Sequence, residues 1–106
     1  MTAKQTPGQW AYHNTPTPFI HVAAGGLPIC EIYTSTAHGQ SMGEQFANAR
    51  LIAAAPELLE AAKLVLEWYE AEDNHSGTDF YQRMQMCRDS EDAIRAAIAK
   101  ATGEQT

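Results

Sequence analysis

Apolar and polar residues alternate early in the chain, and such alternation predicts β-strands. Trp10 and Tyr12 are separated and followed by small or polar residues, which favours a short, half-buried strand. The segment NTPTP (residues 14–18) interrupts it, because proline has no N–H to donate to a strand ladder. We therefore expect the first strand to end before these two prolines.

The next segment, FIHVAAGGLPICEIY (residues 19–33), predicts a β-hairpin. Gly25-Gly26 can adopt the positive φ angles of a two-residue turn. The resulting register pairs Val22 with Ile29 and His21 with Cys30. One face would then carry Ile20, Val22, Ala24, Leu27 and Ile29, and the other Phe19, Ala23, Cys30 and Ile32. Pro28 also predicts a bulge or a free edge in its strand.

A helical period begins near Glu44 and meets a proline at position 56. Proline disfavours the α conformation of the preceding residue but is well tolerated at the start of a helix. The pattern therefore predicts two helices, about Glu44–Ala54 and Pro56–Glu72, that meet at a corner. A single kinked helix is the alternative interpretation.

The second of these helices carries an apolar stripe of Leu59, Ala62, Leu66 and Tyr69, with Leu58 and Val65 beside it. After a hydrophilic turn, Thr78 or Ser76 can cap a third helix. Its apolar residues are Phe80, Met84, Cys87, Ile94, Ile98 and Ala101, at nearly heptad spacing. Gly103 is a suitable residue to end it. Two such helices predict an antiparallel helical hairpin.

The predicted fold is α+β: a short antiparallel β-hairpin or meander packed on three helices, the last two of which form the helical hairpin. We expect one small domain over residues 1–106, with a loose segment 1–7, a β region 9–33 and a helical region 44–102. Two apolar hairpin faces and long apolar helix stripes are more than one small domain can cover. The sequence therefore predicts a homo-oligomer.

Charge is distributed unevenly along the chain, which has a formal net charge of −6. Up to Pro56, two acids balance two bases, whereas eleven acids face five bases from Glu57 onward. An acidic surface repels phosphate backbones, which argues against ordinary nucleic-acid binding. It leaves open a basic partner protein or, as the less favoured alternative, mimicry of nucleic acid. No apolar run is long enough to span a membrane, and the N-terminal residues do not resemble a secretory signal. We expect a cytoplasmic protein.

No spacing typical of a catalytic centre or a nucleotide-binding glycine loop is present, so we expect no enzyme activity and no cofactor. His21 and Cys30 could begin a zinc site, but a packed histidine beside an apolar thiol is the favoured interpretation. His38 lies in a polar loop and is a candidate for ligand contact. Arg50 can bind an anionic group, or it can pair with a carboxylate such as Glu57 or with the C-terminus of the first helix.

Two segments together resemble a known group of proteins. TPGQW (residues 6–10) and ANARLIAAAPELLEA (residues 47–61) resemble small accessory proteins of tailed bacteriophages and prophages. Their pattern is a TPGPW turn, a β-hairpin and an NARLIAAAPELL helix. Gln9 replaces the second proline of the turn. The resemblance implies that Asn48 and Arg50 are the polar members of any shared site, and it places the protein in a bacterial host cell.

Most proteins of this kind have no assigned activity, and the resemblance implies a role in dealing with the host. Small phage proteins of similar build include counter-defence proteins, such as anti-CRISPR-like inhibitors and anti-CBASS or anti-Thoeris sponges for nucleotide signals. Two leading hypotheses follow, beside the alternative of a small enzyme, which the absence of catalytic spacing disfavours. The first is a non-enzymatic protein that binds a host protein through its acidic helical surface. The second is an oligomeric sponge that sequesters a small anionic nucleotide.

Overall fold

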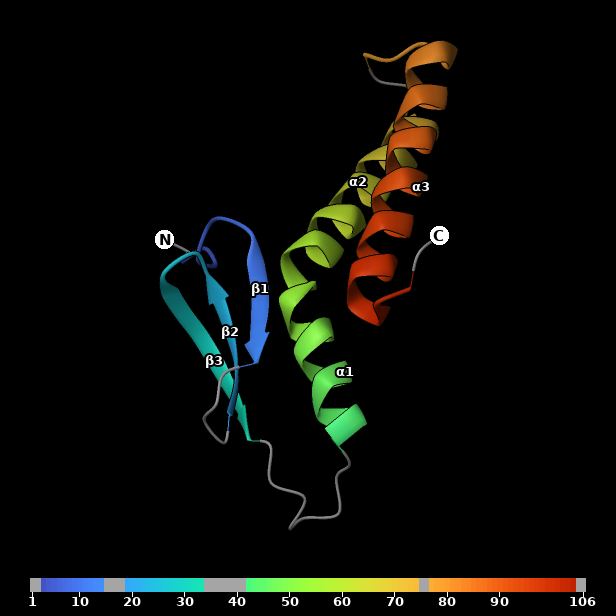
Figure 1. Cartoon of the computed structure of the whole chain (residues 1–106). Helices are drawn as coiled ribbons and strands as arrows, with labels where there is room; N and C mark the ends of the chain where they lie inside the picture. Colours follow the sequence, from blue (N-terminus) through green and yellow to red (C-terminus); the bar gives the residue numbers. More distant parts are fainter. Residues whose placement is uncertain (1–2, 15–18, 34–41, 75–76, 105–106) are drawn as a thin grey trace.

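A computed structural model of the chain describes residues 3–14, 19–33, 42–74 and 77–104. Three strands precede three helices (Figure 1). The strands are β1 (Trp10–Asn14), β2 (Phe19–Ala24) and β3 (Leu27–Tyr33). The helices are α1 (Met42–Ala53), α2 (Ala55–Asn74) and α3 (Phe80–Thr102). The predicted α+β class and order of elements are confirmed.

The three strands form an antiparallel meander in the order β1-β2-β3, and one face of it packs on α1. Ile20 and Val22 on the central strand are completely buried there, and Ala24 is nearly so. From β1, the ring of Tyr12 meets the ring of Phe46 edge to face, with centroids 6.3 Å apart. The central strand β2 therefore supplies the buried residues of the contact with α1, and β1 contacts the same helix beside them.

The register between β2 and β3 differs from the predicted one. Val22 pairs with Cys30 and His21 with Glu31, because a bulge leaves Ile29 as an extra residue in β3. Pro28 lies beside this bulge on an edge strand, so both features that the proline predicted are present. The predicted pairs Val22–Ile29 and His21–Cys30 are wrong, because the register that the turn sets extends only as far as the bulge.

The shift also exchanges the two faces of β3, since a slip of one residue reverses every side chain beyond it. Cys30 and Ile32 share the inner face with Val22 and Ile20. The outer face was predicted to be apolar, and this is wrong for its described part. That part carries Ala11, His13, His21, Ala23 and Glu31.

The first helix covers the sheet with small residues. Ala49 and Ala53 are buried on α1, as is Gln45 one turn earlier. Alanine leaves the helix axis close to the neighbouring elements, because it has no side chain beyond Cβ. As a result α1 contacts all three strands and also α3.

One residue, Ala54, separates α1 from α2, so the chain forms two helices as predicted. The N–H of Ala54 donates to the carbonyl oxygens of Arg50 and Leu51, and its own carbonyl accepts from the N–H of Leu58. Pro56 stands in the first turn of α2, where a missing N–H costs no helical hydrogen bond. α1 lies beside the sheet, whereas α2 leads away from it alongside α3 (Figure 1).

The third helix has a defined cap at each end. Asp79 is the N-cap: its side chain accepts from the N–H of Gln82, whose side chain accepts in return from the N–H of Asp79. The predicted cap at Thr78 or Ser76 is wrong, because the reciprocal capping box is formed by the next residue along. Gly103 ends α3 with φ 74°, as predicted, and donates its N–H to Ala99.

The buried core is small and consists largely of alanine. Its apolar members among the described residues are Ile20, Val22, Ala24, Ala49, Ala53, Ala54, Ala61 and Ala97. The molecule measures 55 × 34 × 22 Å with a radius of gyration of 17.5 Å, against about 13 Å for a compact domain of this length. The helical hairpin α2–α3 extends beyond the layer that contains the sheet (Figure 1). Within the described residues, no helix is long and apolar enough to cross a membrane.

The position of Pro56 makes a prediction about the sign of a stability change. In a first turn, proline stabilises by restricting the unfolded chain, so Pro56→Ala should lower the free energy of unfolding by about 0.5–1 kcal/mol. In a helix interior the same change would stabilise by about 3 kcal/mol. Urea unfolding followed by circular dichroism measures the difference. As a control, Lys63→Pro in the exposed interior of α2 should destabilise by about 3 kcal/mol or more.

Candidate functional site

The helical hairpin has one end that lies far from the sheet (Figure 1). This end combines carboxylates with exposed aromatic rings. We name it the acidic tip and define it as Glu70, Glu72, Asp73, Asp79 and Tyr81. Glu70, Glu72 and Asp73 line a shallow hollow of about 410 Å³ together with Tyr69. Tyr81 is 80% exposed, and its ring contacts that of Phe80 edge to face. These features place aromatic and acidic groups on a projecting surface.

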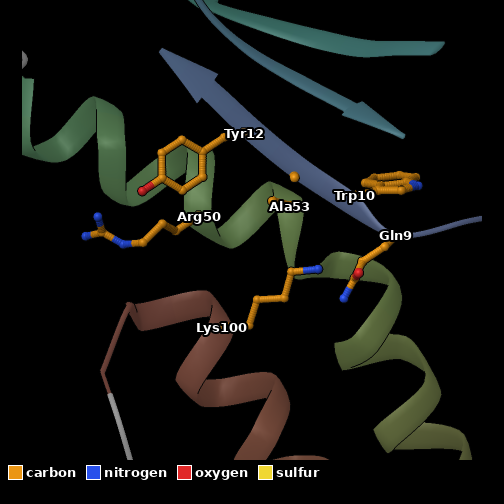
Figure 2. A pocket seen from close by; sticks show the side chains of 7 residues that line it. Gln9, Trp10, Tyr12, Arg50, Ala53 and Lys100 are labelled. Atoms are coloured by element: carbon orange, nitrogen blue, oxygen red, sulfur yellow. The ribbon is translucent and has the colours of Figure 1, made fainter. Parts of the chain in front are cut away.

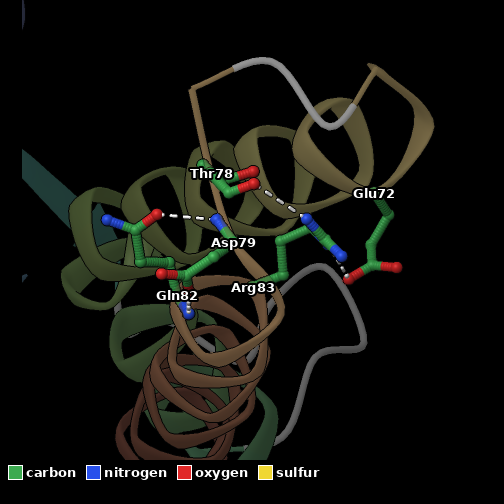
Figure 3. Close-up of polar contacts among 5 residues, drawn as sticks. All are labelled: Glu72, Thr78, Asp79, Gln82 and Arg83. Carbon is green, nitrogen blue, oxygen red and sulfur yellow. Dashed lines mark hydrogen bonds and ion pairs between the residues drawn. The ribbon is translucent and has the colours of Figure 1, made fainter.

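Arg83 contacts residues on both sides of the acidic tip (Figure 3). Its guanidinium donates to the carbonyl oxygen of Thr78 at 3.0 Å, and its Nε lies 3.3 Å from a carboxylate oxygen of Glu72. This second contact is an ion pair and not a hydrogen bond, since no acceptor among the described residues meets Nε at hydrogen-bonding geometry. The side chain of Arg83 is only 12% exposed. Arg83 therefore ties the end of α2 to the residues that begin α3.

The electrostatics of the acidic tip follow from this arrangement. Its four carboxylates are exposed, whereas the neighbouring Arg83 is largely covered and faces one of them. A projecting group of like charges raises the local concentration of opposite charge and accelerates encounters with it. Tyrosine supplies large contact area at low entropic cost, and it is enriched among the residues that dominate binding energy. The acidic tip is therefore suited to a basic protein surface.

A second candidate lies where β1, α1 and α3 meet, and we name it the junction hollow (Figure 2). It encloses about 300 Å³ and is lined by Gln9, Trp10, Ala11, Tyr12, Arg50, Ala53 and Lys100. An adjoining space of about 580 Å³ shares Tyr12, Arg50 and Lys100 with it and adds residues from the end of α3. Two cations and two aromatic rings thus border one concave surface.

The charges around the junction hollow are largely balanced. Nζ of Lys100 donates to a carboxylate oxygen of Glu57 at 2.7 Å, which joins the end of α3 to the start of α2. The side chain of Arg50 lies against Gly103, where a Cβ atom would come within 3.0 Å of its Cδ. Its buried Nε meets no hydrogen-bond acceptor among the described residues. Glu104 lines the adjoining space, so acids accompany both cations.

The predicted site residues are placed differently from one another. Arg50 borders the junction hollow, and its predicted alternative partner Glu57 pairs with Lys100 instead. Asn48 is exposed on α1 and lines neither of the two spaces that Arg50 borders. His38 lies outside the described residues. Sequence reasoning missed Lys100 and Tyr12, because nothing in the spacing of residues so far apart indicates that they converge.

The hairpin histidine and cysteine do not form a shared site. His21 lies on the outer face with Nδ1 3.6 Å from a carboxylate oxygen of Glu31, whereas Cys30 follows the inner face beside Val22. Burial raises the pKa of the Cys30 thiol, so this sulfur is a poorer thiolate ligand than an exposed cysteine. Within the described residues, no three His, Cys, Asp or Glu side chains are grouped so that they could hold a metal ion.

Comparison with known protein families gives a match over residues 1–105, to the family described as Salmonella phage P22 protein Y8K6. The chain belongs to this family. The match supports the phage origin that the resemblance in the turn and the α1–α2 segment indicated, and it extends over the helical hairpin as well. No curated protein and no solved structure matches the chain.

Arg83 provides a test of how the acidic tip is held. Arg83→Met keeps the apolar stem but leaves the half-buried carbonyl of Thr78 without its donor, which should cost about 1–2 kcal/mol. Glu72→Gln should cost less than about 0.5 kcal/mol, because the carboxylate is nearly half exposed. Urea unfolding measures both. Hydrogen exchange of the amides in residues 77–82 should accelerate in the first variant only, and equal exchange in both would contradict this role of Arg83.

Proposed function

We propose that this phage protein is a non-enzymatic accessory protein that counters a host defence by binding a host protein through the acidic tip. The phage family supports an accessory role, and the excess of acid in the second half of the chain supports a basic partner. The observation that carries the proposal is the acidic tip itself: a braced projection that exposes Tyr81 among four carboxylates.

The local contacts of the acidic tip support binding in preference to a merely solvated turn. The capping box of α3 and the contacts of Arg83 fix the residues on both sides of the connection. A surface that is ordered before binding loses less conformational entropy on association. The partner that fits it presents arginine or lysine side chains around an apolar contact for the tyrosine ring.

A second candidate function is sequestration of a small anionic nucleotide, which the junction hollow favours. The buried Nε of Arg50 has no hydrogen-bond partner in the described part of the chain, and the rings of Trp10 and Tyr12 border the same space. Aromatic faces stack on bases, and arginine binds phosphate. Glu57 and Glu104 oppose this function, since they offset the positive charge that a phosphate needs. The balance of charge makes the acidic tip the stronger candidate.

Binding through the acidic tip predicts a loss of host-protein capture when its charge is removed. The double variant Glu70→Gln/Asp73→Asn should recover about tenfold less of the partner from host lysate, and capture by the unaltered protein should weaken as salt is raised. Quantitative mass spectrometry measures both. In a host that carries the relevant defence, the same variant should lose the ability to restore phage plating.

The matched control is Glu60→Gln/Glu104→Gln, which removes two carboxylates near the opposite end of the hairpin. Both double variants raise the formal net charge from −6 to −4, so they separate the place of the charge from its amount. Equal losses in the two variants, or no reproducible partner with the unaltered protein, would contradict binding at the acidic tip.

Nucleotide sequestration has its own prediction. If the junction hollow binds a nucleotide, isothermal titration calorimetry against a panel of cyclic nucleotides gives saturable heat with one of them. Arg50→Ala should abolish that heat, and Arg88→Ala, at an exposed arginine of α3 that does not border the hollow, should keep it. Absence of heat with every nucleotide removes the second candidate and leaves the first intact.

A further inference from the structure

One face of the helical hairpin is apolar along both of its helices. On α2 the stripe consists of Leu58, Leu59, Ala62, Val65, Leu66 and Tyr69. On α3 it consists of Phe80, Met84, Cys87, Ile94 and Ile98. On α2 the steps are of three or four residues, with flanking neighbours. On α3 they are also of three or four residues, except for a step of seven from Cys87 to Ile94, where Glu91 occupies the intervening position. This is the heptad spacing of helices that pack side by side in a bundle.

The two stripes lie on the same side of the hairpin. Val65 and Tyr69 of α2 line one groove of about 460 Å³ together with Cys87, Ile94 and Ile98 of α3. We name this surface the apolar face. On α3 it lies away from Ala96 and Ala99, which border the space beside Arg50 on the α1 side. Neither the sheet nor α1 therefore covers it.

The apolar face exposes more hydrophobic surface than a small monomer usually carries. Its most exposed members, between 36% and 61%, are Leu59, Leu66, Tyr69, Phe80, Met84, Ile94 and Ile98. Seven such side chains leave on the order of 600 Å² in water before the half-buried Val65, Trp68 and Cys87 are added. A stable interface buries about 800 Å² per partner. The apolar face therefore supplies roughly the area of one subunit interface.

The small core of the molecule indicates that the apolar face is covered permanently by a partner. The hairpin is closed by small residues, since Ala61, Ser90 and Ala97 are its buried members. Elsewhere among the described residues, Ile20 and Val22 are the only large apolar side chains that are fully buried. Small domains with so little core usually need an additional source of stability, such as association. A second copy of the same chain is the partner that is present whenever the protein is made.

The charges on the hairpin point to the same partner. Glu91 and Arg95 are the charged residues that line the groove, and they form an ion pair at 2.8 Å. The apolar face is thus neutral, although the chain carries a net charge of −6. Two acidic chains can approach each other across such a face without direct repulsion, whereas a basic partner gains nothing from it.

We infer that two copies of the chain pack through their apolar faces as a two-fold symmetric dimer, in which the two helical hairpins form a four-helix bundle. Both copies contribute the same surface, as a two-fold interface requires. Facing pairs of heptad stripes are the arrangement from which four-helix bundles are built. The apolar face adjoins the acidic tip at Tyr69 and Phe80. The inference is nevertheless tested independently of the proposed host target, because the substitutions that test it lie outside the acidic tip.

Sedimentation equilibrium tests the dimer directly. The full chain should have twice its mass of 11.6 kDa. Leu66→Glu and Ile98→Glu, at positions already exposed in the single chain, should each shift the mass to that of a monomer or raise the dissociation constant at least tenfold. A monomer at tens of micromolar, or dimers unaffected by both substitutions, would overturn the inference, as would a defined mass other than two chains.

A substitution that strengthens the contact keeps the inference testable if separated chains unfold. Glu91→Leu completes the heptad stripe on α3 and should lower the dissociation constant at least tenfold and raise the melting temperature. Asp92→Leu changes the adjacent residue, which is exposed and does not line the groove, and should do neither. Equal effects of the two substitutions would show that added surface hydrophobicity, and not the apolar face, is responsible.

Discussion

The break between α1 and α2 is the constraint on which the rest of the structure depends. Ala54 separates the two helices, and Pro56 stands in the first turn of the second. One alanine-rich stretch therefore contributes both to the layer that packs on the sheet and to the helical hairpin. α1 covers the sheet, and α2 leaves it to pair with α3. The end of α3 returns to the same corner, where Lys100 pairs with Glu57 and Gly103 lies against Arg50. The segment that carries the family resemblance is therefore also the structural corner of the molecule.

The small residues at the contacts between the helices and the sheet have two consequences. Alanine and serine let the helices and the sheet approach closely, but they bury little apolar surface and so stabilise the single chain weakly. The larger apolar side chains of α2 and α3 are left on one outer face, while the acids occupy the remaining surface and the tip. The proposed dimer covers the apolar face, and the proposed host contact uses the acidic tip. One hairpin can thus hold two copies together and still present a separate binding surface.

The β region shows how a correct local prediction can give a wrong arrangement. The turn at Gly25-Gly26, and the bulge or free edge indicated by Pro28, could be predicted from residue chemistry alone. The bulge, however, decides which side of the sheet each following residue of β3 occupies. Ile29 takes the extra position, and Cys30 therefore joins the inner face instead of meeting His21. The hypothesis that this pair begins a zinc site is therefore wrong, because a register shift of one residue separates the two side chains.

The sequence by itself determined the elements: the meander, the helix break, the Gly103 terminus, the apolar stripes and the uneven charge. These follow from backbone preferences and from periodicity, both of which act between residues that are close along the chain. Only the tertiary structure decided the partners, such as Lys100 with Glu57, Arg83 with Thr78, and Tyr12 beside Arg50. Asp79 in place of Thr78 as the cap of α3 was decided by local geometry that composition does not resolve. Contacts between distant segments depend on how whole elements pack, and no spacing in the sequence encodes that packing.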